Sequence, residues 1–342
     1  MRILVTGGGG FVGRAVVERL LARGHRVRCF SRSAYPELAA RGAEVMRGDL
    51  ADPRAAAAAC AGCDAVVHAA ALIPGVPEPP RRYQAVNVGG TEAIIAGCRA
   101  HGVPRLVFTS SPSVVFGGHD LRGVDESVPY PKRYDSPYAR TKAAAERAVL
   151  AANDGALATT ALRPHLVWGP GDAHLVPELI ARARAGRLVR VGRGPFRVDV
   201  TYIDCAAEAH LLALDALAPG SAAAGRAYFI SQGEPVDLWE FVGRLLRMAG
   251  VAEVHRQVPR WLALAAAGAV EGAFRVTGRR TAPPLTRFLV REISSSHWFD
   301  IGAARRDLGY RPVVSIDEGL NRLAHWWQSG GAAGGGHRQT SA

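Results

Sequence analysis

The chain has 342 residues, 48 % of them apolar, which is enough for a sizeable buried core in one domain or two. Its formal charge of +12 comes from arginines scattered along the sequence without a basic run, which argues against a nucleic-acid partner and requires only an anionic cofactor or substrate. No apolar run reaches the ~18 residues of a membrane span, and five cysteines with no leader-like segment before the first strand predict a reducing, cytoplasmic location.

Short apolar segments alternate with amphipathic helical segments along the first third of the chain. The expected strands cover residues 3–6, 26–30, 43–47, 64–69 and 105–110, and the expected helices cover 11–23, 52–60 and 83–101. Near-continuous apolar strands separated by helices are typical of a parallel sheet that is covered on both faces. The sequence therefore predicts an α/β fold with a doubly wound parallel sheet of Rossmann type.

The rest of the chain first continues this sheet and then departs from it. A helix is expected over 136–153, a strand over 159–164, and a strand over 198–204 followed by a helix that Asp204 caps. From Arg226 the sequence is irregular and richer in Trp, Phe and Pro, which indicates a smaller substrate-binding lobe. The predicted domains are 1–168 with 198–217 returning to it, 169–197 with 226–328 as the lobe, and 329–342 as a flexible tail.

The stretch TGGGGFVG (6–13) directly follows the first strand and opens the first helix. Gly7, Gly10 and Gly13 fit the spacing Gly-x-x-Gly-x-x-Gly, with Phe11 and Val12 at the start of the helix. Glycines are required where the backbone turns tightly and approaches a pyrophosphate, whose charge then meets the helix N-terminus. This placement favours a dinucleotide site over a plain glycine-rich turn.

A different pair, Cys60 and Cys63, has redox-type spacing at the end of an alanine-rich helix. No second pair completes a zinc site, so these are read as ordinary thiols and no metal is predicted.

The end of the second strand distinguishes the two nicotinamide cofactors. An NAD site usually offers an acidic residue there for the ribose 2′-hydroxyl, whereas an NADP site replaces it and supplies arginine for the 2′-phosphate. The sequence places Ser31 and Arg32 at these positions, which predicts NADPH and makes NAD the less favoured cofactor. The alternative for Arg32 is a solvated surface arginine. Asp49 and Leu50, in RGDL after the third strand, are expected at the adenine, unless Asp49 caps the next helix.

Lysine is rare here, occurring only at Lys132 and Lys142 against forty arginines. Lys142 follows Tyr138 by four residues, which places both side chains on one face of a helix. Tyrosine has an ordinary pKa of about 10, so proton transfer at neutral pH needs help that a neighbouring cation can give by favouring the phenolate. The pair therefore predicts a proton-transfer site, although an exposed helix lysine is the alternative.

A third polar group is expected at the end of the fifth strand, in FTSSPSV (108–114). Ligands of open parallel sheets bind at this carboxyl edge, so a hydroxyl there can hold a substrate oxygen. Ser111 is the chosen residue, with Ser110 and Ser113 as neighbours that can equally be capping or turn serines.

Six ordered stretches together resemble the extended short-chain dehydrogenase/reductase family, and within it the 3β-hydroxysteroid dehydrogenase branch. The stretches are TGGGGFVG, RGDL, DAVVHAAA, TSSPSV, YARTK and ALRPHLVWGPGD, and the resemblance extends from residue 1 to about 327. The resemblance implies that Tyr138 protonates the developing alkoxide, Lys142 lowers the pKa of Tyr138, and Ser111 hydrogen-bonds the carbonyl. It also implies that the nicotinamide end of the cofactor is lined by Ala69, Ala70, Ala71, Asn87 and the Arg163–Pro164 turn.

The C-terminal half is similar to bacterial 2-alkyl-3-oxoalkanoate reductases of long-chain olefin synthesis and, less closely, to sterol-4α-carboxylate 3-dehydrogenases. Both families interconvert a 3-hydroxy and a 3-keto acid with a bulky apolar substituent, but sterol oxidation normally uses NAD. Ser31 and Arg32 therefore favour the reductase and a hydrophobic small-molecule substrate. A non-catalytic dinucleotide sensor is the remaining alternative, and the complete Ser111, Tyr138 and Lys142 set argues against it.

The segment 258–276 is apolar and helical in character. It can cover an acyl tunnel, rest on a membrane surface beside Arg260, Arg275, Arg279 and Arg280, or serve as an ordinary core or dimer helix. A homodimer is the expected assembly.

Four further residues are expected to contribute to the substrate pocket. His165 and Trp168 are expected at its mouth, and Arg163 and Arg193 are candidates to bind a substrate carboxylate.

Overall fold

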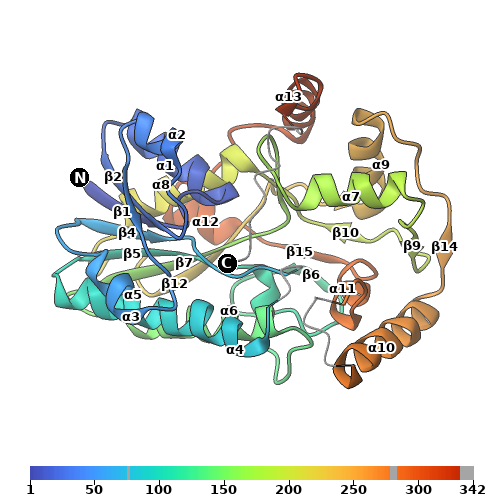
Figure 1. Cartoon of the computed structure of the whole chain (residues 1–342), viewed down its shortest axis with the longest axis horizontal. Helices are drawn as coiled ribbons and strands as arrows, with labels where there is room; N and C mark the ends of the chain where they lie inside the picture. The colour runs from blue at the N-terminus through green and yellow to red at the C-terminus, as the bar shows by residue number, and fades with distance from the viewer. Residues whose placement is uncertain (75–77, 278–282, 332–342) are drawn as a thin grey trace.

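The computed structural model describes residues 1–74, 78–277 and 283–331. Its largest element is a parallel sheet of seven strands in the order β12-β7-β5-β4-β1-β2-β3 (Figure 1). The strands are β1 (Arg2–Thr6), β2 (Arg26–Ser31), β3 (Glu44–Arg47), β4 (Ala65–His68), β5 (Arg105–Thr109), β7 (Ala158–Pro164) and β12 (Arg226–Ile230). Because the chain adds strands on one side of β1 and then crosses to β4 on the other, ligands are expected at the carboxyl ends of β1 and β4. The predicted doubly wound fold is confirmed.

Helices cover both faces of this sheet, which explains why its strands are apolar throughout. On one face α1 (Phe11–Ala22) packs against α8 (Ile203–Ala216), and on the other α5 (Gly90–Ala100) packs between α3 and α6 (Figure 1). The remaining helices around the sheet are α2 (Pro36–Ala40), α3 (Pro53–Ala58), α4 (Pro80–Tyr83), the π-helix η1 (Gln84–Gly89), the 3₁₀ helix η2 (Pro112–Val114), α6 (Pro137–Ala151), α12 (Gly302–Asp307) and α13 (Ile316–Gln328).

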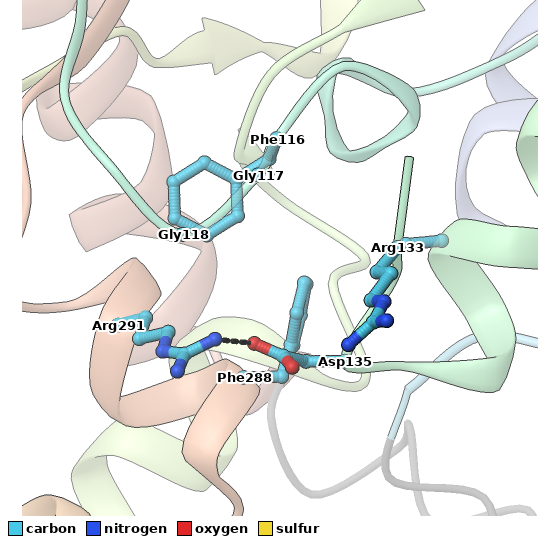
Figure 2. Close-up of a pocket in the computed structure, with 8 residues that line it drawn as sticks. Phe116, Gly117, Gly118, Arg133, Asp135, Phe288 and Arg291 are labelled. Atoms are coloured by element: carbon cyan, nitrogen blue, oxygen red, sulfur yellow. Dashed lines mark hydrogen bonds and ion pairs between the residues drawn. The ribbon is translucent and has the colours of Figure 1, made fainter. Parts of the chain in front are cut away.

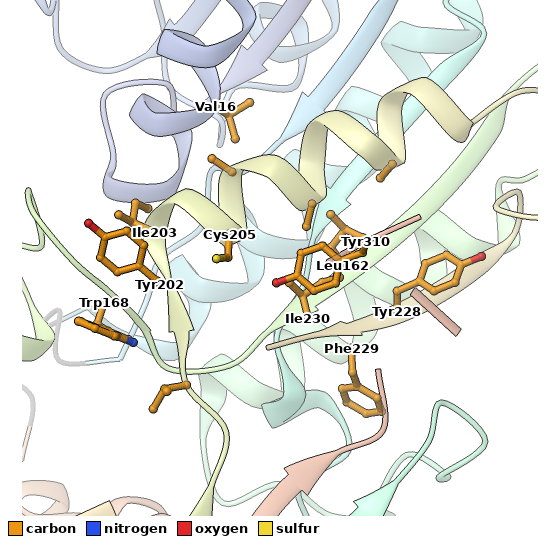
Figure 3. Packing of buried hydrophobic residues seen from close by; sticks show 14 of the residues in the cluster. Val16, Leu162, Trp168, Tyr202, Ile203, Cys205, Tyr228, Phe229, Ile230 and Tyr310 are labelled. Atoms are coloured by element: carbon orange, nitrogen blue, oxygen red, sulfur yellow. The ribbon is translucent and has the colours of Figure 1, made fainter. Parts of the chain in front are cut away.

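A large aromatic core lies beside α8. Figure 3 shows Tyr202, Cys205 and Tyr310 gathered near this helix, and Trp168 makes an edge contact with Tyr202 at a ring distance of 5.2 Å. Trp168 has no exposed surface, so its expected place at the pocket mouth is wrong. His165 is also buried, with Nδ1 2.7 Å from the carbonyl oxygen of Asp199.

A smaller lobe, defined here as the three short sheets with α7, α9, α10 and α11, lies beyond the carboxyl edge of the main sheet (Figure 1). Its sheets have the orders β13-β10-β15-β6, β11-β8 and β14-β9. Their strands are β6 (Leu121–Val124), β8 (Val167–Trp168), β9 (Arg190–Val191), β10 (Arg197–Val198), β11 (Thr201–Tyr202), β13 (Val236–Asp237), β14 (Gln257–Val258) and β15 (His297–Phe299). Its helices are α7 (Leu175–Arg184), α9 (Leu238–Met248), α10 (Arg260–Val276) and α11 (Arg287–Glu292).

Two boundary predictions need correction. The strand expected over 198–204 is split into β10 and β11, and α8 begins at Ile203, so Asp204 lies inside the first turn and does not cap it. Asp204 instead forms ion pairs with Arg19 and Arg322. Residues 226–230 were assigned to the substrate lobe, but they form β12 at the edge of the main sheet. The predicted tail lies, from residue 332 onward, outside the described residues.

Helix α10 is the most exposed apolar element of the smaller lobe. Only Ala263 and Ala267 are buried, whereas Trp261 is 71 % exposed. None of the helices in the described part of the chain is both long and apolar enough to cross a bilayer. The membrane contact and the homodimer both stay predictions, and two of the flanking arginines, Arg279 and Arg280, lie outside the described residues.

Candidate active site

The glycine loop joins β1 to α1 in a backbone conformation that residues with a side chain rarely adopt. Gly7 has φ +69°, and its N–H donates to the carbonyl oxygen of Phe30 at 2.9 Å. A Cβ on Gly13 would lie 2.1 Å from the oxygen of Gly7. Gly10 caps α1 without a side-chain hydrogen bond, so the first N–H groups of the helix, including those of Phe11 and Val12, are free to bind an anion. The loop therefore fits a dinucleotide pyrophosphate.

The end of β2 has no acidic residue. Ser31 Oγ donates to the carbonyl oxygen of Ser33 at 2.9 Å, and Arg32 follows it at the same sheet edge. Burial opposes ionisation of Asp49, but the N–H of Ala51 and the charges of Arg82 and Arg32 outweigh it and lower the pKa of Asp49. Arg32 is thus close enough to act on a negative charge beside this edge.

Asp49 does not cap the next helix, because Asp52 does, accepting hydrogen bonds from the N–H groups of Arg54 and Ala55. Leu50 is buried and packs against Gly90 of α5, where a Cβ would lie 2.3 Å from Leu50 Cγ. Their expected contacts with adenine stay predictions.

The predicted Ala69, Ala70 and Ala71 segment lies directly against the glycine loop. The N–H of Ala70 donates to Thr6 Oγ1 at 3.2 Å, and a Cβ on Gly7 would lie 2.8 Å from the Cα of Ala70. Asn87, in the π-helix η1, accepts a hydrogen bond from the N–H of Leu72 at 2.7 Å and donates to Thr141 Oγ1 at 3.1 Å. One amide therefore connects this segment to α6, the helix that carries Tyr138 and Lys142.

Local capping sets the position of Tyr138. Ser136 accepts a hydrogen bond from the N–H of Tyr138, and Pro137 occupies the first helical position of α6. One turn later Lys142 is buried, with Nζ donating to the carbonyl oxygen of Thr109 at 2.5 Å and lying 3.9 Å from the Phe108 ring centroid. These contacts fix α6 to the carboxyl end of β5.

Ser111 follows β5 and caps η2, accepting a hydrogen bond from the N–H of Ser113 at 3.2 Å. Its hydroxyl is also close enough to Tyr138 to lower the pKa of that phenol, against the larger effect of burial. The hydroxyl oxygens of Ser110 and Ser113 are buried and have no hydrogen-bond partner among the described residues. Of these three serines, Ser111 is the one whose hydroxyl acts on Tyr138.

Burial shifts the pKa values of Tyr138 and Lys142 in opposite directions. Burial raises the pKa of Tyr138 to about 12, although the Ser111 hydroxyl opposes the rise. Burial lowers the pKa of Lys142 to about 7, and the charge of Glu146 opposes that fall. The prediction that Lys142 lowers the pKa of Tyr138 stays a prediction, because loss of hydration is the largest influence on both groups here.

Two acidic residues of the site were missed by the sequence analysis. Glu146, one turn after Lys142 in α6, is fully buried and forms a two-bond ion pair with Arg163, the residue before Pro164 at the end of β7. Glu146 follows Lys142 by four residues in α6, and this spacing was the signal in the sequence that could have identified it. Glu292, at the end of α11, raises the pKa of Tyr138 by its charge, while burial raises the pKa of Glu292 itself to about 7. No local pattern marks Glu292.

A model of the 3-beta hydroxysteroid dehydrogenase/isomerase family matches residues 4–260, three quarters of the chain. The chain belongs to this family. It is 52 % identical over 325 residues to a 2-alkyl-3-oxoalkanoate reductase of Stenotrophomonas maltophilia, covering 94 % of this chain and 98 % of that protein. It is 38 % identical over 348 residues to a 3 beta-hydroxysteroid dehydrogenase/Delta 5→4-isomerase of Mycobacterium tuberculosis, covering 96 % and 90 %.

Among solved structures, a Thermus thermophilus UDP-glucose 4-epimerase in complex with NAD matches with a TM-score of 0.73 and 26 % identity, covering 96 % of this chain and 99 % of that one. The family, its relatives and the glycine loop together make this chain an NAD(P)-dependent oxidoreductase of the extended short-chain dehydrogenase/reductase type. A bound nicotinamide dinucleotide would meet the N-terminus of α1 through its pyrophosphate.

Proposed function

We propose that the enzyme reduces the 3-keto group of a long-chain 2-alkyl-3-oxoalkanoic acid to the 3-hydroxy acid and uses NADPH. The end of β2 carries this proposal, because Ser31 and Arg32 stand where an NAD enzyme usually has a carboxylate. The name of the Stenotrophomonas maltophilia relative supports the substrate class.

In this proposal Ser111, Tyr138 and Lys142 are the catalytic residues. The nicotinamide, when bound, supplies the hydride that goes to C3 of the substrate. Ser111 hydrogen-bonds the carbonyl oxygen, and the proton on Tyr138 Oη moves to that oxygen as negative charge develops there, after which Tyr138 regains a proton from solvent. Lys142 would hold the ribose of a bound cofactor. Asn87 and Thr141 position α6 beside the alanine segment.

The raised pKa of Tyr138 supports the direction of reduction. A phenol with a pKa of about 12 stays protonated throughout the neutral range, which is the state that a proton donor needs. Oxidation of an alcohol would need the phenolate, which burial disfavours here. The second candidate, oxidation of a 3β-hydroxysteroid or sterol carboxylate with NAD, is favoured only by relatives such as the Mycobacterium tuberculosis protein.

Steady-state kinetics with stable substrates test the proposal. Since 3-keto acids lose carbon dioxide readily, we would follow oxidation of a 2-alkyl-3-hydroxy acid and of a 3β-hydroxysteroid, each with NADP⁺ and with NAD⁺. We expect the hydroxy acid with NADP⁺ to give the highest kcat/KM. Arg32→Ala should lower kcat/KM for NADP⁺ about 10- to 100-fold, because one charged hydrogen bond to phosphate is lost. Tyr138→Phe should lower kcat by about 10²- to 10⁴-fold.

Arg26→Ala is the matched control for Arg32, since Arg26 is exposed at the opposite end of the same strand. Preference for the steroid with NAD⁺ would replace the proposal by the dehydrogenase alternative. Equal rates for the native chain and Tyr138→Phe would show that Tyr138 transfers no proton.

A further inference from the structure

A cavity of about 170 Å³ opens between the start of α6 and helix α11 (Figure 2). It is enclosed by residues from three segments: Phe116, Gly117, Gly118, Arg133, Asp135, Ala139, Phe288 and Arg291. The rings of Phe116 and Phe288 meet edge to face with centroids 6.1 Å apart, so one part of the wall is aromatic and the rest is charged.

The segments that line this cavity adjoin the proposed catalytic residues in the chain. The Gly117–Gly118 turn closely follows Ser111 and η2, and Ala139 is the neighbour of Tyr138 in the first turn of α6. Arg291 lines the far wall, and the charge of the next residue, Glu292, acts on Tyr138 from outside the lining. A group bound in the cavity therefore contacts segments that directly adjoin Ser111 and Tyr138 in the chain.

The charged wall has one arginine in excess. Arg291 forms an ion pair with Asp135, whereas Arg133 has neither an ion pair nor a side-chain hydrogen bond among the described residues. In Figure 2 the Arg133 guanidinium lies on the opposite side of Asp135 from Arg291. Two guanidinium groups and one carboxylate leave a net positive charge, which suits a single anionic group.

The two arginines considered from sequence fit this task less well. Arg163 is 3 % exposed and its charge is compensated by Glu146, so the structure removes it as a carboxylate ligand. Arg193 is exposed in the loop between β9 and β10 and does not line the cavity.

We propose that Arg133 binds the carboxylate of the substrate, with Phe116 and Phe288 against the adjoining alkyl carbons. This inference rests on the proposed function, because only there is a carboxylate two bonds from the reacting carbon. The short separation requires an anchor beside Ser111 and Tyr138, and the cavity supplies one. Arg133 then selects acids over neutral ketones of the same shape.

Comparing a 2-alkyl-3-hydroxy acid with its methyl ester isolates the contribution of this charge. Arg133→Met, which keeps an unbranched side chain, should lower kcat/KM for the acid about 10- to 100-fold and change the ester less than about threefold. Arg133→Lys should recover part of the loss for the acid. Lys132→Met is the matched control, because Lys132 is exposed next to Arg133 but does not line the cavity, and both substrates should be unaffected.

A second variant predicts a change of the opposite sign. Asp135→Asn leaves Arg291 unpaired, so the KM for the acid should fall while that for the ester stays constant. If Arg133→Met leaves the acid-to-ester ratio of the native chain unchanged, the inference is overturned and the proposed function stands. If the native chain oxidises neither acid nor ester but accepts a 3β-hydroxysteroid, the proposed function itself fails, and this inference with it.

Discussion

Two ion pairs of identical composition, one in each half of the molecule, differ in how deeply they are buried. Arg163 and Glu146 join β7 to α6 at 2.7 Å, with side chains that are 3 % and 0 % exposed. Arg287 and Glu271 join α11 to α10 at 2.8 Å, with side chains that are 48 % and 16 % exposed. The first pair lies under the catalytic helix, and the second lies at the rim of the smaller lobe.

This difference indicates that side chains around the main sheet are held more rigidly than those of the smaller lobe. Around the main sheet, Lys142, Asn87 and the glycine loop have defined partners, so their positions are fixed to the accuracy that proton and hydride transfer require. In the smaller lobe, α10 buries only Ala263 and Ala267, which pack in a small cluster with Val191 and Val290. Changes of substrate within the family are therefore expected there, at little cost in stability.

Removing the carboxylate from each pair should give the largest difference in stability between the two halves. Glu146→Gln leaves Arg163 with a buried, uncompensated charge, and we expect the free energy of unfolding to fall by about 3–5 kcal/mol. Glu271→Gln in the exposed pair should cost less than about 1 kcal/mol. Urea denaturation followed by circular dichroism measures both. Similar losses for the two variants would mean that the halves do not differ in this way.

Two helical glycines, one in each half, test the same difference in packing. A Cβ on Gly13 of α1 would meet the backbone oxygen of Gly7, whereas a Cβ on Gly272 of α10 would meet no atom within 4 Å. We expect Gly13→Ala to cost about 1–3 kcal/mol through overpacking and to weaken NADPH binding, measured by the quenching of tryptophan fluorescence. Gly272→Ala should instead stabilise the chain by up to about 1 kcal/mol, because alanine favours the helix.

The thermal midpoints of these two variants should therefore move in opposite directions. A lower midpoint for Gly272→Ala would show that α10 is packed more closely than its exposure indicates.

Local sequence patterns predicted the features that depend on local geometry. The first five strands were found because each is a short apolar run, and Tyr138 and Lys142 were paired because a spacing of four residues places them on one helical face. The glycine loop was found because it stands between a strand and a helix. These features need no knowledge of the distant chain.

Features that depend on distant partners were predicted less well. The strand expected over 198–204 is interrupted because Asp199 turns into the interior, where its Oδ2 accepts a hydrogen bond from the N–H of Phe299. Arg133 and Arg291 line one cavity although they are more than 150 residues apart in sequence. The raised pKa of Tyr138 follows from burial, which the sequence around it does not reveal.

The charge of Glu292 on Tyr138 gives the smallest expected effect, and its sign depends on pH. A carboxylate near a phenol disfavours the phenolate, so Glu292→Gln should lower the pKa of Tyr138. Oxidation needs the phenolate, so at pH 8 the variant should oxidise a 2-alkyl-3-hydroxy methyl ester up to about tenfold faster than the native chain. At pH 5.5 the two should agree, because Glu292, with a pKa of about 7, is then already neutral.

The ester is chosen because it is uncharged. An acid substrate would itself be repelled by the Glu292 carboxylate, and this would obscure the effect on Tyr138. Glu240→Gln is the matched control, since Glu240 is exposed in α9, and its pH profile should coincide with that of the native chain. A constant ratio between Glu292→Gln and native rates from pH 5.5 to 8 would mean that the carboxylate affects the rate by shape alone. If the ratio of Glu292→Gln to native rates instead grows through pH 7, the charge of Glu292 acts directly on Tyr138. A residue of the smaller lobe would then set the pKa of the proton donor beside the main sheet.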